Sequence, residues 1–215
     1  MTARRVGRTG LAAVVLAAGP SVLAAQQQFV GVSYMWSLPT GDAKSFTNND
    51  SWLGFDINAH RFINPDRTIA VGSIIGWNEL YWKTSETIDF TFAQHGAGSV
   101  QSLQYRDFNI YPFLVGADYY FHLHGKPALQ PYVGAYLGVY YIRQTFDIST
   151  VEFTTFNWIF GWAPEAGIRL LQRSGGSVYL FARYHWPVNA GQFLPNNIAQ
   201  SIRYLSIGVG FGFGR

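Results

Sequence analysis

The sequence predicts an all-β protein, folded as an eight-stranded antiparallel up-and-down transmembrane β-barrel. Three observations predict this fold. Apolar residues alternate with polar residues and glycine from Phe29 to the C-terminus, which is the period of a strand with two different faces. The connections between the alternating stretches are short and long in turn. Only 13% of the residues are charged and 17% are aromatic, whereas charged residues make up about a quarter of a soluble domain.

The first 25 residues have the pattern of a cleaved export signal. Arg4, Arg5 and Arg8 precede an apolar stretch, Leu11–Ala18, and small residues suited to cleavage follow at Val22-Leu23-Ala24. The apolar stretch is far shorter than the roughly 20 residues of a membrane-spanning helix. We therefore predict a signal peptide at 1–25 and a single barrel domain at 26–215.

The charge balance and the absence of cysteine exclude several kinds of partner and site. The signal contains three of the 15 Lys and Arg and none of the 12 Asp and Glu, so the rest of the chain carries no net charge. A nucleic-acid partner would need a basic face on the folded domain, and none is expected. A chain without cysteine has no disulfides, thiolate nucleophiles or Cys-ligated metal sites.

The first predicted strand is Phe29–Ser37, and a long segment, 38–50, follows it. The second strand, Ser51–Ile63, and the third, Thr68–Thr84, are joined by the short turn 64–67, which reads Asn-Pro-Asp-Arg. Each strand is about as long as the 9–11 residues that a tilted strand needs to cross a bilayer, or longer.

A second long segment, 85–102, leads to the fourth strand, Leu103–His122. The segment also alternates, which favours a hairpin that continues the two strands above the membrane and offers an apolar surface to a ligand or a neighbour. The turn 124–127 joins the fourth strand to the fifth, Leu129–Phe146, and a third long segment, 147–154, follows.

The sixth strand, Thr155–Leu171, and the seventh, Ser177–Val188, are joined by the glycine-rich turn 172–176. The last long segment, 189–200, leads to the eighth strand, Ser201–Gly214. Short turns at one end and long loops at the other are typical of barrels in a bacterial outer membrane, with the turns on the periplasmic side and the loops outside the cell.

The two faces of the strands differ in a way that indicates lipid outside the barrel. In the eighth strand Leu205, Ile207 and Val209 share one face, while serine and glycine occupy the other. The same phase directs a set of ionisable side chains into the lumen, where we expect mutual pairing: Asp56, His60, Asp118, Glu165, Arg169, Arg183 and His185. A soluble barrel needs the opposite arrangement, so the pattern predicts outer-membrane lipids as neighbours.

The tryptophans provide an independent indication of a membrane. All seven fall in the half of their strand nearer the long loops, where we expect them to anchor at the membrane interface: Trp36, Trp52, Trp77, Trp82, Trp158, Trp162 and Trp186. A soluble sandwich with aromatics in its core would not explain this one-ended distribution.

Four stretches resemble the small outer-membrane β-barrel proteins, in particular the barrel-only relatives of the OmpA transmembrane domain and OmpW. They are Gly31–Asp42, Gln130–Tyr141, Gly161–Gly167 and Ile207–Phe213. The resemblance spans nearly the whole chain after the signal. It implies an eight-stranded barrel in the bacterial outer membrane, inserted by the barrel-assembly machinery.

Three functions are compatible with this fold. The first is a non-enzymatic barrel that stabilises the envelope or interacts at the surface, with a lumen largely plugged by ion pairs. The second is an OmpW-like channel or uptake route for small hydrophobic molecules, which needs an apolar pocket open at the outer end. The third, a lipid-modifying enzyme, needs a nucleophile beside a base, and the sequence places no serine beside His185.

No metal or cofactor is predicted. His122 and His124 are spaced to share one side of a strand, but they lack a third ligand.

Overall fold

A computed structural model of the chain describes residues 28–92, 96–148, 151–172, 175–188 and 202–214. The predicted signal peptide, residues 1–25, and the predicted segment 189–200 lie outside these residues. Within the described part of the chain, no helix is long and apolar enough to cross a membrane.

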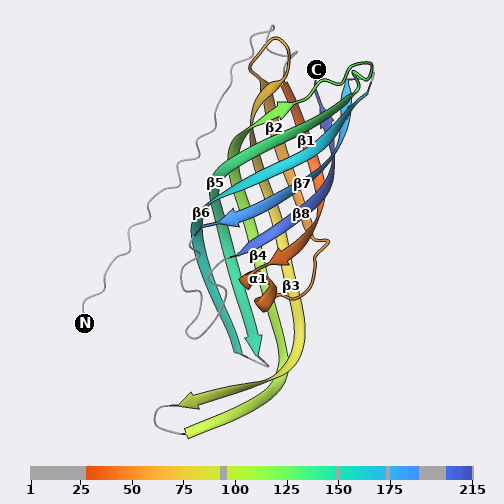
Figure 1. Cartoon of the computed structure of the whole chain (residues 1–215). Coiled ribbons are helices and arrows are strands. Elements are labelled where there is room, and N and C mark those ends of the chain that lie inside the picture. The colour runs from red at the N-terminus through yellow and green to blue at the C-terminus, as the bar shows by residue number, and fades with distance from the viewer. Residues whose placement is uncertain (1–27, 93–95, 149–150, 173–174, 189–201, 215) are drawn as a thin grey trace, which may run out of the picture.

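The described strands form one closed antiparallel barrel, so the predicted fold class is confirmed. Each strand pairs with its neighbours in the sequence, and the last strand pairs with the first to close the ring. The strands are β1 (Gln28–Thr40), β2 (Gly54–Phe62), β3 (Ile69–Phe92), β4 (Gly96–Tyr120), β5 (Leu129–Ile148), β6 (Val151–Leu171), β7 (Gly176–Pro187) and β8 (Arg203–Phe213). Figure 1 shows the C-terminus at one end of the barrel and the β3–β4 hairpin projecting beyond the other.

Two hairpins extend beyond the predicted strands. Of the segment 85–102, residues 85–92 continue β3 and residues 96–102 begin β4, and the two strands stay in register from Ile69↔Tyr119 to Phe92↔Gly96, as the alternation favoured. The predicted loop 147–154 is wrong, because β5 and β6 remain paired up to Ile148↔Val151. In both hairpins the backbone groups continue to satisfy one another beyond the barrel, so pairing ends only near the tip.

The outward face carries an apolar band that matches the thickness of a bilayer. Large apolar side chains such as Ile57, Val115 and Leu180 are more than half exposed on this face. Along β4 and the residue that follows it, the band runs from Tyr111 to Phe121, ten residues apart. At about 3.3 Å per residue and a tilt of about 40°, these residues span about 25 Å, the height of the apolar band on outer-membrane barrels.

A short helix closes the end of the barrel that bears the long hairpins. Helix α1 (Asp42–Phe46) follows β1, within the predicted segment 38–50, and buries Ala43 and Phe46. The Phe46 ring lies 4.7 Å from the Phe108 ring, measured between centroids, and 6.3 Å from that of Phe146. The first long segment therefore folds into the mouth of the barrel at the long-hairpin end.

Glycines on the inward face make room for aromatic rings from the neighbouring strand. A Cβ atom at Gly210 would collide with the Tyr179 ring, and one at Gly116 with Tyr136. Small residues on one strand and large rings on the next fill the narrow interior of an eight-stranded barrel.

Candidate functional site in the lumen

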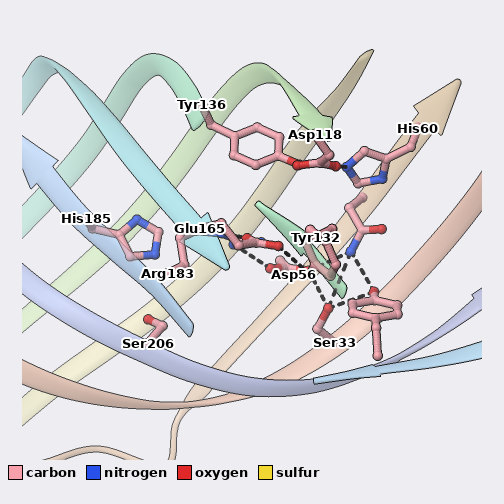
Figure 2. Close-up of polar contacts among 12 residues, drawn as sticks. Ser33, Asp56, His60, Asp118, Tyr132, Tyr136, Glu165, Arg183, His185 and Ser206 are labelled. Atoms are coloured by element: carbon pink, nitrogen blue, oxygen red, sulfur yellow. Dashed lines mark hydrogen bonds and ion pairs between the residues drawn. The ribbon is translucent and has the colours of Figure 1, made fainter. Parts of the chain in front are cut away.

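Arg183 lies in the middle of the lumen and holds two carboxylates from other strands. Its Nε donates to Glu165 Oε2 at 2.5 Å, and its Nη1 donates to Asp56 Oδ2 at 2.7 Å. Figure 2 shows the three side chains converging from β7, β6 and β2. Arg183 is 1% exposed, and a charge so deeply buried is tolerated only when it is paired and hydrogen-bonded. The triad therefore links three strands across the lumen.

Neutral donors complete the hydrogen bonding of both carboxylates. Ser33 Oγ and Asn58 Nδ2 donate to Asp56 Oδ1, at 2.8 and 3.1 Å. Tyr132 OH donates to Glu165 Oε1 at 2.7 Å. Every carboxylate oxygen of the triad thus has a partner, as a buried polar network needs in order to be stable.

A second cluster joins β2, β4 and β5 nearby. His60 Nε2 lies 3.1 Å from Asp118 Oδ2, and Tyr136 OH donates to Asp118 Oδ1 at 2.5 Å. The His60 ring also stacks on Phe29, with centroids 4.7 Å apart. These contacts hold the imidazole between a carboxylate and an aromatic face, and Figure 2 shows His60 beside Asp118 and Tyr136.

The prediction that Arg169 pairs with the lumen acids is wrong. Its guanidinium instead lies 3.8 Å above the Phe29 ring, and no ion pair joins it to an acid among the described residues. Along β6, Arg169 is four residues nearer the short-turn end than Glu165, so it belongs to a different layer of the lumen.

His185 also lies apart from the ion pairs. Its Nδ1 is 3.2 Å from Tyr140 OH, and its ring stacks on that of Tyr204 at 4.2 Å. Both contacts are on the long-hairpin side of Arg183, within an aromatic layer. The sequence placed His185 inside the barrel but could not place it among these rings.

Apolar and aromatic side chains fill the lumen on both sides of the charged layer. One cluster occupies the end closed by α1, and includes Phe46, Leu80, Phe108, Ile110, Tyr140 and Ile142. The other lies toward the short turns, and includes Phe29, Phe62, Tyr120, Tyr132 and Tyr179. Between the charged groups a cavity of about 10 Å³ remains, which is about the least space that holds one water molecule.

Six of the tryptophans predicted at the membrane interface occupy outward positions: Trp36, Trp52, Trp77, Trp158, Trp162 and Trp186. The assignment of Trp82 is wrong. Trp82 shares the inward phase of Leu80 on β3, and the Arg106 guanidinium lies 5.0 Å from the centre of its ring. Its height along the strand matches the membrane interface, but its phase directs it toward the inward face.

The alternation places Tyr132 and Tyr136 on the inward face with Gly134, but it gave no role to them or to the small polar groups that hold the charges. Which carboxylate each tyrosine contacts follows only from the structure. Among the described residues, no group of three His, Asp or Glu side chains could hold a metal ion. The chemistry that the site displays is ion pairing and hydrogen bonding within the lumen.

No protein-family model matches the sequence, and none of the curated proteins matches it. Among solved structures, Neisserial surface protein A is 16% identical, with 87% of this chain and 97% of that chain covered and a TM-score of 0.54. OprG from Pseudomonas aeruginosa is 14% identical, with 89% of this chain and 98% of that chain covered and a TM-score of 0.48. Ail from Yersinia pestis is 12% identical, with 87% of this chain and 97% of that chain covered and a TM-score of 0.43. The resemblance inferred from the sequence is confirmed at the level of the fold, which is that of the small eight-stranded outer-membrane β-barrels.

Proposed function

We propose that this chain is an integral protein of a bacterial outer membrane with a closed lumen. In this proposal it has no enzymatic activity, and its role is to stabilise the envelope or to interact at the cell surface. Lipids surround the outward apolar band, the barrel-assembly machinery inserts the chain, and residues 1–25 direct its export.

The observation that carries the proposal is the layered filling of the lumen. An ion crossing the barrel would have to pass the apolar cluster beneath α1, then the Arg183 triad, then the aromatic rings near the short turns. The triad resists opening because separating its charges would leave them buried and unpaired, at a cost of several kcal/mol per ion. A resting barrel of this kind conducts no ions.

The β3–β4 hairpin supports a role at the surface. Its strands have 24 and 25 residues, more than twice the 9–11 that cross a bilayer. Beyond Tyr111 the outward side chains of β4 include Asn109 and Asp107, so this part of the sheet suits water. The hairpin therefore presents a paired, two-sided surface outside the membrane (Figure 1).

Uptake of small hydrophobic molecules has weaker support from the same residues. That function needs an apolar pocket open at the outer end, where Phe46 instead packs against Phe108. Helix α1 would have to leave the mouth before a solute could enter.

Single-channel recording in a planar bilayer tests the proposal. Refolded protein of residues 26–215 should give no conductance steps, while an added open porin in the same bilayer shows that steps are detectable. Steady small steps that a small hydrophobic solute blocks would refute the closed lumen and favour uptake.

A further inference from the structure

A cavity of about 450 Å³ opens at the short-turn end of the barrel, away from the charged layer. It is within the range of small-molecule sites, about 300–1,000 Å³. Phe62, Leu171 and Pro65 give it an apolar lining. Two of the polar groups that line it, on Arg169 and Gln130, bury atoms without hydrogen-bond partners.

Arg169 is the first of these groups. It is 5% exposed and lines the cavity, and its Nε is buried without a hydrogen-bond partner. Phe29 covers one face of the guanidinium at 3.8 Å. Because the guanidinium is planar, its N–H groups lie in that plane and can be reached only along its edges. A carboxylate is the partner that such an edge binds, through two parallel hydrogen bonds.

Gln130 is the second. It pairs directly with Arg169 across β5 and β6, lines the same cavity, and buries an Oε1 atom that accepts no hydrogen bond. Directly opposite residues on one face of a sheet have Cβ atoms about 5 Å apart. A ligand that offers a carboxylate to Arg169 and, one or two atoms away, an N–H group to Gln130 would satisfy both.

The charges at the rim favour an anion. Arg67 lines the opening together with His122, and among the described residues Asp66 is the acid that lines it. With Arg169, two guanidinium groups thus border the cavity against one carboxylate.

We propose that this cavity binds the carboxylate end of a peptide or of an N-acylated amino acid, entering from the periplasmic side. Both ligands place an amide N–H next to a carboxylate, and both can carry a small apolar side chain against Phe62 and Leu171. The site does not depend on whether the lumen is closed.

Calorimetric titration of the protein in lipid nanodiscs tests the proposal. Tri-alanine and N-acetyl-alanine are the probes, and they separate the peptide from the acylated amino acid as the source of the carboxylate. We expect at least one of them to bind, tri-alanine amide to lose binding because it lacks the carboxylate, and propionate to bind at least tenfold more weakly because it lacks the N–H.

Variants locate the site. Arg169→Gln should weaken binding at least tenfold, since a hydrogen bond to a charged group contributes about 1.5–3 kcal/mol. Gln130→Leu should weaken it while leaving propionate unaffected. Arg61→Gln is the matched control, because Arg61 is exposed on the outward face of β2 near the same end, and it should leave binding unchanged.

Heat-modifiable gel migration establishes that each variant is folded, and Arg169→Lys replaces Arg169→Gln if the latter does not fold. Unchanged affinity in the Arg169 variant would overturn the proposal. So would an equal loss in Arg61→Gln, or inorganic phosphate displacing the bound probe at the probe's own concentration.

Discussion

Replacing Arg183 by methionine should destabilise the barrel strongly, because it leaves two buried carboxylates without a counter-charge. Asp56 is fully buried and Glu165 nearly so. Removing one member of a buried ion pair costs about 3–5 kcal/mol. Ser33 and Tyr132 still donate to the two carboxylates, so the loss should lie near the lower limit, about 3 kcal/mol.

Urea unfolding of the protein in lipid vesicles, followed by tryptophan fluorescence and gel migration, measures this loss. With a denaturant slope of about 3 kcal/mol per molar, the midpoint should fall by about 1 M. The matched variant combines Arg183→Met with Asp56→Asn and Glu165→Gln, which removes every charge of the triad. This triple variant should recover most of the lost stability, because an uncharged replacement of a buried ion network is often nearly neutral.

Two results would refute the reasoning. One is an Arg183→Met barrel as stable as the unmodified protein to within about 0.5 kcal/mol, the usual range of surface substitutions. The other is a triple variant no more stable than the single one, which would show that unpaired charge is not the cause of the loss.

Other substitutions test the remaining layers. Phe46→Ala should destabilise the barrel by about 3–5 kcal/mol, because Phe46 packs in the lumen core, yet leave it silent in planar bilayers, because the Arg183 triad still blocks the lumen; conductance steps in this variant would show that the Phe46 ring alone closes the barrel. Gly210→Ala should destabilise the barrel by about 1–3 kcal/mol through overpacking against Tyr179, and the loss should shrink when Tyr179→Ala is also present. Val115→Arg, in the exposed apolar band, should cost about 2–4 kcal/mol in vesicles, whereas Val115→Leu should cost little; equal effects would argue against lipid at this face.

The alternation of residue types determined the barrel and the contents of its lumen. The outward face of the strands is mainly apolar, while the inward face carries the ionisable groups, the glycines and most of the buried aromatic rings, so the phase of Asp56, Glu165 and Arg183 could be read locally, residue by residue. Side chains alternate between the two faces because of the backbone geometry of a single strand. The face of a residue can therefore be predicted without knowing which strands pair with its own.

The partners within the lumen could not be predicted in the same way. Whether Arg169 or Arg183 meets Glu165 depends on the height of each side chain along the barrel axis, and that height follows from strand tilt and register rather than from phase. The error over Trp82 has the opposite origin, because its height was considered and its phase was not. The ends of the β5–β6 hairpin were missed because backbone pairing continues where the side chains no longer need to face lipid.

The sequence by itself therefore determined which strand residues face the lumen and which face outward, because phase is a local property of a strand. This two-faced pattern in turn determined the fold. Only the tertiary structure decided that Arg183 links Asp56 and Glu165, that α1 fills the mouth at the long-hairpin end, and that Arg169 and Gln130 border an open cavity. These contacts join residues far apart in the chain, and their geometry is fixed only when register closes the ring.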